Sequence, residues 1–128
     1  MKSGASVTRD QLLVLQAKAM SEAELVSGVI KLAHDYGWLV AHFRPAKTEK
    51  GWRTLLQGDK GFPDIILANG YRLLFIECKS ETGTVKPDQH GWMTALRVTG
   101  VAGAVQTFFW KPTQWLNGVI EEELRRPR

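Results

Sequence analysis

The feature that most constrains this fold is an Asn-Gly dipeptide between two apolar segments. Asn69-Gly70 separates residues 64–68 from residues 71–79, and both segments are rich in branched and aromatic side chains. Asn-Gly favours a two-residue hairpin turn, because both positions tolerate the positive φ angles that such a turn requires. The pattern therefore predicts two antiparallel strands joined by a tight turn.

The predicted hairpin brings charged residues to one face of the sheet. A two-residue turn places Asp64 opposite Phe75. Because side chains alternate along a strand, Glu77 and Lys79 then share a face with Asp64. Asp64 and Glu77 become diagonal neighbours, within reach of one shared cation. The prediction depends on the turn, since a one-residue change in its length would move Asp64 to the opposite face.

Two carboxylates on one face of an apolar hairpin suggest a metal site. Without a cation they would repel each other and resist ionisation. Their hard oxygen atoms favour Mg²⁺ or Mn²⁺, and the backbone carbonyl of Cys78 is a candidate third ligand. The Lys79 ammonium group could then orient a water or stabilise charge on a phosphoryl group. An alternative remains open, in which Asp64, Glu77 and Lys79 only form a solvated rim of the hairpin.

Periodicity elsewhere predicts an α/β domain in the order helix, three strands, helix, strand, helix. Ser21 and Glu24 have the spacing of a capping box at the start of the first helix, and Pro87 begins the second. We expect an N-terminal arm over residues 1–20, helical or irregular, and a single domain over residues 21–128. The expected helices cover residues 21–36, 87–100 and 112–124, and the expected strands cover residues 38–43, 64–68, 71–79 and 104–110.

Glu22 is a further candidate metal ligand on the first helix. It lies one turn before Leu25 and Val26 on the apolar stripe, so it is predicted to point inward. Glu24 falls on the solvated side and already has a capping role. The alternative for Glu22 is a first-turn acid that interacts with the helix dipole, and both interpretations remain open.

Residues 44–62 break all periodicity and carry a local positive charge. The segment holds five basic residues against two acidic ones, whereas the whole chain has 17 basic and 13 acidic residues and a net charge of +4. A loop of this length inside a compact domain is usually functional or disordered. Basic side chains bind phosphates without reading base sequence. The candidate DNA contacts are Arg44, Lys47, Lys50, Arg53, Lys60 and Lys86.

Composition excludes several other classes of protein. The single cysteine excludes a disulfide framework and a Cys-based zinc site, and it suits a reducing compartment. No apolar run approaches the length of a membrane span, and the N-terminus lacks the features of a signal peptide. We therefore expect a cytoplasmic protein with no membrane partner.

Four short motifs follow one another along the chain. They are Ser21-Glu22-Ala23-Glu24-Leu25, Gly61-Phe62-Pro63-Asp64, Phe75-Ile76-Glu77-Cys78-Lys79 and Pro87-Asp88-Gln89-x-x-Trp92. Together they resemble the VRR-NUC (virus-type replication-repair nuclease) family of the PD-(D/E)xK superfamily. The resemblance covers about residues 21–110 and implies a restriction-endonuclease-like fold, with a mixed sheet flanked by helices.

The resemblance also implies roles for individual residues. The implied catalytic residues are Asp64, Glu77, Lys79 and Gln89, and the implied metal ligands are Glu22, Asp64, Glu77 and the backbone carbonyl of Cys78. Mg²⁺ or Mn²⁺ would be the cofactor. The alternative for Gln89 is an ordinary surface position on a helix. Cys78 stands where many members carry an aliphatic residue, but only its carbonyl is required.

Members of this family that consist of the domain alone resemble viral or prophage proteins and homodimeric Holliday-junction resolvases. The resemblance therefore implies a metal-dependent, structure-selective DNA endonuclease that acts on branched DNA as a homodimer, in the host cytoplasm if it is viral. The 1–20 arm, Trp52 and the last helix are candidate dimer contacts. Two other functions remain open: a non-catalytic DNA-binding protein on a nuclease fold, and a nuclease for flaps, nicked or single-stranded DNA.

Overall fold

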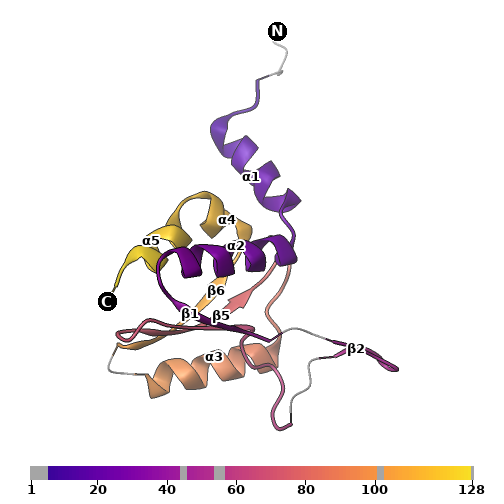
Figure 1. The fold of residues 1–128 in the computed structure, drawn as a ribbon. Coiled ribbons are helices and arrows are strands. Elements are labelled where there is room, and N and C mark those ends of the chain that lie inside the picture. The colour runs from indigo at the N-terminus through magenta and orange to yellow at the C-terminus, as the bar shows by residue number, and fades with distance from the viewer. Residues whose placement is uncertain (1–5, 44–45, 54–56, 101–102, 128) are drawn as a thin grey trace.

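A four-stranded mixed sheet forms the centre of the molecule (Figure 1). The computed structural model describes residues 6–43, 46–53, 57–100 and 103–127. The sheet has the order β1-β4-β5-β6, in which β4 is antiparallel to both β1 and β5, and β6 is parallel to β5. Its strands are β1 (Leu39–His42), β4 (Ile65–Ala68), β5 (Leu73–Cys78) and β6 (Val105–Trp110). The predicted mixed sheet flanked by helices is confirmed.

Helices cover both faces of this sheet (Figure 1). On one face α2 (Glu22–Asp35), α4 (Pro112–Leu116) and α5 (Val119–Arg125) enclose the main core, and on the other lies α3 (Pro87–Thr99). Because side chains alternate along β4 and β5, every second residue enters the core beneath α2. The fully buried strand residues on that face are Ile65, Leu67, Leu74, Ile76 and Cys78. The intervening residues face α3.

The first helix of the domain begins where its capping box predicts. Ser21 Oγ accepts a hydrogen bond from the Glu24 N–H at 3.0 Å, and Glu24 Oε1 accepts one from the Ser21 N–H at 2.9 Å. Leu25 and Val29 lie fully buried on the apolar stripe of α2. This helix therefore anchors one face of the sheet through the pattern visible in the sequence.

The hairpin turn between β4 and β5 is two residues longer than predicted. Ala68 pairs with Leu73, so four residues separate the two strands, and Ile66 rather than Asp64 lies opposite Phe75. The predicted pairing of Asp64 with Phe75 is therefore wrong. Because the register differs by an even number of residues, Asp64 nevertheless keeps its predicted face. The last pair of the ladder, Ile65 with Ile76, directly adjoins Asp64 on one strand and Glu77 on the other.

The longer turn is explained by Asn69 and Arg72. Asn69 Oδ1 accepts hydrogen bonds from the backbone N–H groups of Tyr71 and Arg72, at 2.9 Å and 2.7 Å, which builds a side-chain-stabilised turn. The Arg72 side chain is buried, pairs with the Glu123 carboxylate and donates to the Glu123 carbonyl at 2.9 Å. Its guanidinium also lies 5.6 Å from the centre of the Trp38 ring. These contacts hold the turn against α5.

The C-terminal segment departs from the prediction of one helix. It forms two short helices, α4 and α5, because Gly118 between them has a φ of +85°. A left-handed residue cannot continue a right-handed helix. The break turns α5 back over the sheet, where Ile120 and Leu124 enter the core.

Residues 44–62 contain more regular structure than their sequence indicates. Two short strands, β2 (Ala46–Thr48) and β3 (Gly51–Arg53), pair antiparallel and form a separate two-stranded hairpin. Figure 1 shows this hairpin projecting beyond the end of the sheet at which α2 and α3 begin.

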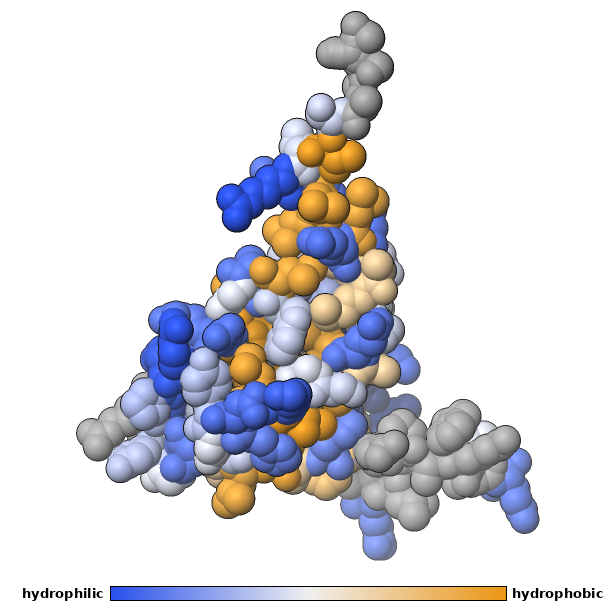
Figure 2. Space-filling view, turned by 45° about the horizontal axis from the view of Figure 1, so that its top comes forward, coloured by the Kyte–Doolittle hydropathy of each residue, from blue (hydrophilic) through white to orange (hydrophobic). Residues whose placement is uncertain are grey.

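The predicted N-terminal arm contains a helix, α1 (Arg9–Ala19), which packs against α4 and projects from the body of the molecule (Figure 1). Thr8 and Gln11 form a capping box at its start. Figure 2 shows apolar side chains gathered on this arm, and four of them are exposed: Val7, Leu12, Val14 and Leu15. Among the described helices, none combines the length and apolar character needed to cross a bilayer.

Candidate active site

Glu77 lies at the centre of the candidate site. Its side chain is only 2% exposed, on the face of β5 that is turned toward α3. Oε2 accepts a hydrogen bond from Gln89 Nε2 at 3.1 Å and lies 3.7 Å from Lys79 Nζ. Oε1 is buried and has no hydrogen-bond partner among the described residues. An unsatisfied buried oxygen of this kind costs about 1–3 kcal/mol and leaves one lobe of the carboxylate available to a ligand.

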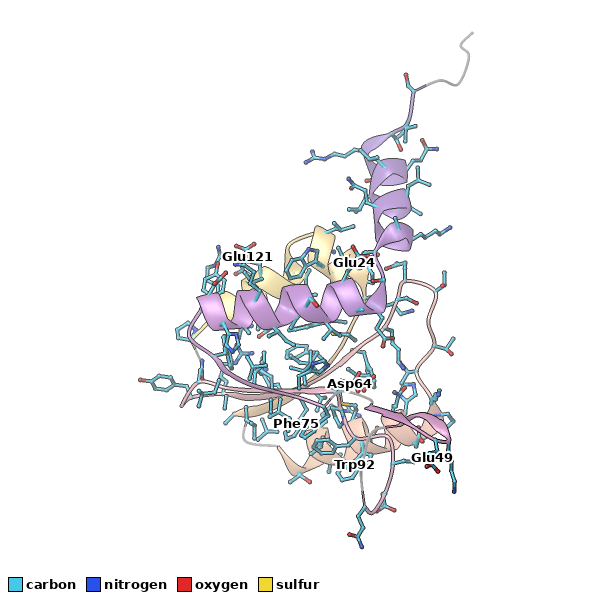
Figure 3. The ribbon with its side chains drawn as sticks, turned by 45° about the vertical axis from the view of Figure 1, so that its right-hand side comes forward. Glu24, Glu49, Asp64, Phe75, Trp92 and Glu121 are labelled. Carbon is cyan, nitrogen blue, oxygen red and sulfur yellow. The ribbon has the colours of Figure 1, made fainter. Side chains whose placement is uncertain are left out.

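Asp64 supplies the second carboxylate. It directly precedes β4, and its backbone carbonyl accepts a hydrogen bond from the Phe43 N–H at 2.9 Å, which fixes the residue beside β1. Figure 3 shows Asp64 at the level of the sheet, with Trp92 of α3 beneath it. Burial, followed by the neighbouring Asp64 carboxylate, raises the pKa of Glu77 to about 8, while the Lys79 ammonium opposes the shift. The two carboxylates therefore resist ionising together.

Lys79 follows the last residue of β5 and shares its face with Glu77. Its backbone N–H donates to the Trp110 carbonyl at 2.9 Å, so the neighbouring strand β6 fixes its position. The side chain is 11% exposed. Its ammonium group is therefore held next to the carboxylates and retains a path to solvent.

Gln89 reaches the site from the first turn of α3. Its Oε1 accepts a hydrogen bond from the Lys86 N–H at 3.0 Å, while its Nε2 donates to Glu77 Oε2. Because both ends of the amide are engaged, the orientation of the side chain is defined. The structure thus brings Gln89 to the predicted carboxylate, which an ordinary surface position would not do.

Tight packing holds the second motif against α3. Gly61 has a φ of +95°, and a Cβ there would lie 2.7 Å from the Asp88 carbonyl carbon. The Phe62 ring contacts Trp92 edge-on, with centroids 4.9 Å apart, and Phe75 at 6.0 Å. Gly61 and Phe62 lie in the same motif as Asp64, but nothing in the local sequence indicates that they pack against α3. These contacts set the position of the segment leading into Asp64.

Glu22 lies in the first turn of α2, where the residue is exposed rather than enclosed by the core, and its role as a metal ligand stays a prediction. It nevertheless belongs to the electrostatic environment of the site. Partial burial raises the pKa of Glu22, the Lys79 ammonium opposes that change, and the Asp64 carboxylate reinforces it. Glu22 therefore lies at the margin of the site.

The donor groups fit a hard divalent cation. Among the described residues, no three Asp, Glu, His or Cys side chains lie close enough together to hold a metal ion. The side-chain donors are thus the pair Asp64 and Glu77, and Mg²⁺ commonly takes one or two carboxylates and completes its shell with waters. The unpartnered Glu77 Oε1 and the repulsion between the two acids are features that a cation would relieve.

The predicted DNA contacts are only partly described. Lys50, Lys60 and Lys86 are exposed, and Lys86 directly precedes α3 at the end of the molecule that holds Gln89. Arg44 and the side chains of Lys47 and Arg53 lie outside the described residues.

A mixed sheet that presents Asp64 and the Glu77-x-Lys79 pair from adjacent strands is the arrangement of PD-(D/E)xK nucleases. The VRR-NUC domain model matches residues 39–109, more than half of the chain. The protein belongs to the VRR-NUC family, and the resemblance in its motifs and the restriction-endonuclease-like fold are both confirmed. The match begins after Glu22. No curated protein matches the chain.

Proposed function

We propose that this VRR-NUC nuclease is a Mg²⁺- or Mn²⁺-dependent DNA endonuclease selective for branched DNA. The observation that carries the proposal is the setting of Glu77, which is buried, oriented by Gln89, adjacent to Lys79 and close enough to the Asp64 carboxylate to interact with it. A solvated rim does not require a buried carboxylate with an unsatisfied oxygen. A metal-dependent hydrolase does require such an oxygen, because the oxygen becomes a ligand of the metal ion.

The residues of the site divide the catalytic work. Asp64, Glu77 and the Cys78 carbonyl would hold the cation, which when bound activates water and neutralises phosphate charge. Lys79 stabilises the negative charge that develops on the phosphoryl oxygens. Gln89 is a positioning residue, since it orients Glu77 and reaches the reaction only through that carboxylate.

Recognition of DNA structure would come from contacts outside the metal site. The exposed cations Lys50, Lys60 and Lys86 are suited to binding phosphates. Phosphate contacts depend on the path of the DNA backbone and not on the base sequence. Arg44, Lys47 and Arg53 would extend this surface. The β2–β3 hairpin projects past the site end of the sheet and could follow a second DNA arm (Figure 1).

We further propose that the nuclease acts as a homodimer. A homodimer would place two sites across a Holliday junction and permit symmetric incision. The exposed apolar side chains of the arm, among them Leu12 and Leu15, offer a dimer contact (Figure 2). The proposed setting is the cytoplasm of a cell that carries a phage or prophage.

The deciding experiment compares labelled four-way junctions, flaps, nicked duplex, single strands and linear duplex in Mg²⁺, Mn²⁺ or EDTA. We expect metal-dependent incision of the junction by the wild type. Lys79→Ala should lose at least about a hundredfold in rate while retaining junction binding, because it removes charge stabilisation in the transition state. Binding without incision on every substrate would indicate a non-catalytic protein. Incision of flaps, nicked or single-stranded DNA in preference to junctions would change the substrate class.

A further inference from the structure

A pocket of about 470 Å³ opens between α3 and the segment that leads into Asp64. Its lining combines an apolar helix surface with three charged side chains, and consists of Asp59, Lys60, Asp88, Gly91, Trp92 and Ala95. A volume of this order is typical of sites for small organic ligands. The pocket adjoins the candidate active site, because Asp88 directly precedes Gln89, which donates a hydrogen bond to the Glu77 carboxylate.

Gly91 lies inside α3, where neither the helix nor the packing around it requires a glycine. It does not have the positive φ that would favour glycine, and an added Cβ would meet no described atom within 4 Å. Gly61, by contrast, has a positive φ and lies against the backbone of Asp88. Glycine is less favourable than alanine inside a helix, so the fold alone does not explain Gly91. The missing side chain leaves the helix backbone open to a ligand in the pocket.

Trp92, labelled in Figure 3, forms an aromatic wall of the pocket. Its Nε1–H donates to the Asp59 carbonyl at 3.2 Å, and its ring contacts Phe62 edge-on with centroids 4.9 Å apart. The indole ring is therefore held in place without a ligand. Aromatic side chains of this kind bind nucleobases by stacking, whatever the base, because every base has a π-face.

The charges of the pocket favour a nucleobase over a phosphate. Asp59 and Asp88 supply two carboxylates against the single ammonium group of Lys60, which leaves a net negative charge. Asp88 Oδ1 accepts a hydrogen bond from the Gln89 N–H at 2.8 Å, which fixes that carboxylate. Carboxylates repel phosphates but accept hydrogen bonds from the amino groups of bases. The exposed Lys60 suits the phosphate of the same nucleotide.

We propose that this pocket receives one nucleobase turned out of the DNA stack beside the cleaved bond. The proposal rests on the proposed function and gives a physical basis for the selectivity for branched DNA. Turning a base out of a duplex breaks stacking and pairing, and it costs least where these are already weakened. A branch point interrupts the stack, so a base enters the pocket more readily there than in linear duplex. The pocket thus senses DNA structure without reading sequence.

The first test fills the pocket. Gly91→Leu places a side chain in the open space, whereas Thr94→Leu adds the same side chain at an exposed position of α3 that does not line the pocket. The DNA ligands are four-way junctions with an abasic site at each nucleotide near the branch in turn. Binding is measured in EDTA, which prevents metal-dependent cleavage.

We expect one abasic position to weaken binding by the wild type and by Thr94→Leu about tenfold, the effect of losing one stacked base. Gly91→Leu should bind the intact junction about tenfold more weakly than the wild type. The abasic site should change its affinity by less than about twofold, because the base and the open pocket act as a pair. Equal abasic losses in all three proteins, or no sensitive position in the wild type, would overturn the proposal.

A second measurement needs no substitution in the protein. 5-Iodocytosine is placed at single positions of the junction, and irradiation crosslinks it to an adjacent aromatic ring. We expect crosslinks to Trp92, mapped by mass spectrometry, from a position at the branch and not from the middle of an arm. Absence of a Trp92 crosslink from every position near the branch would contradict the proposal even if no variant folds.

The two proposals fail in different ways. Metal-dependent cleavage of branched DNA with no coupling between the abasic site and Gly91→Leu would remove only the base pocket. Coupling and a Trp92 crosslink without cleavage of any substrate would support the pocket and count against the endonuclease. A wild-type protein that binds none of the branched or linear DNA substrates would remove both.

Discussion

Gln89 donates a hydrogen bond to the buried carboxylate of Glu77 at 3.1 Å and simultaneously accepts one from the N–H of Lys86. A single amide therefore links the start of α3 to the candidate metal ligand. The same local sequence, Lys-Pro-x-Gln, recurs at the start of α4, where Gln114 Oε1 accepts from the Lys111 N–H at 2.8 Å. Of these two glutamines, only Gln89 also contacts a carboxylate of the candidate site, that of Glu77.

This duplication provides a matched pair of variants. Gln89→Ala should weaken Mn²⁺ binding and DNA cleavage by about 10–100-fold, the usual effect of removing a group that orients a metal ligand. Gln114→Ala loses the same type of helix cap and should leave both quantities within about twofold of the wild type, because the cap contributes to stability alone. Calorimetry and cleavage rates measure the two effects. Equal losses in the two variants would assign Gln89 a capping role only.

Glu77→Gln should stabilise the metal-free protein while abolishing its activity. The folded protein holds the Glu77 proton more tightly than the unfolded chain, since burial raises its pKa from an ordinary value near 4.5 to about 8. The stability associated with the protonated acid is complete below pH 4.5 and is lost as pH rises toward 8. The free energy of unfolding should therefore fall by an amount on the order of a few kcal/mol over this pH range.

Urea unfolding in EDTA from pH 5 to 8.5 measures this prediction. The midpoint of the wild type should fall across the range, and the Glu77→Gln midpoint should fall much less. Saturating Mg²⁺ should restore the wild type at pH 8, because it binds the folded ionised form. Parallel pH profiles for the two proteins would contradict the prediction.

Gly61→Ala should be strongly destabilising. The added methyl group would collide with the Asp88 backbone at 2.7 Å, and the positive φ of +95° is unfavourable for alanine. We expect a loss of about 2–4 kcal/mol in the free energy of unfolding. Gly91→Ala, within the same helix α3 and with nothing within 4 Å of its added Cβ, should instead gain about 0.5–1 kcal/mol. Thermal and urea denaturation of both variants provide the comparison.

Glu22→Gln tests whether the margin of the site takes part in metal binding. The Mg²⁺ concentration for half-maximal cleavage should rise several-fold, because a negative charge near Asp64 and Lys79 is removed. Glu24→Gln is the control on the same turn of α2, since glutamine preserves the capping box. If the two variants share one Mg²⁺ titration curve with the wild type, Glu22 is only a first-turn acid.

The hairpin shows which parts of this fold local sequence can predict. Alternation places Asp64 and Glu77 on one face for any even change in register, so the shared face was predictable even though the pairing was not. The pairing depends on Arg72, whose side chain bonds to Gln106 in β6 and to Glu123 in α5, 34 and 51 residues later in the chain. No local pattern around Asn69 carries that information.

In the candidate site, too, some features follow from local sequence and others depend on tertiary packing. Asp64, Glu77 and Lys79 follow from strand alternation, and the start of α2 follows from its capping box. The contact between Gln89 and Glu77 depends on how α3 docks, which in turn requires that Gly61 have no side chain. The break at Gly118 was missed because glycine within an apolar stripe is compatible with both a helix and a turn.

The contacts that Arg72 makes with the C-terminal segment affect the order in which the protein folds during translation. The guanidinium donates to backbone carbonyls 51 and 54 positions further along the chain, so its partners emerge from the ribosome well after the hairpin itself. Until they arrive, burying Arg72 would leave a charge without a counterpart, which strongly disfavours closure of the turn. The nascent chain therefore contains both candidate metal ligands before the turn between their two strands can close around a buried Arg72.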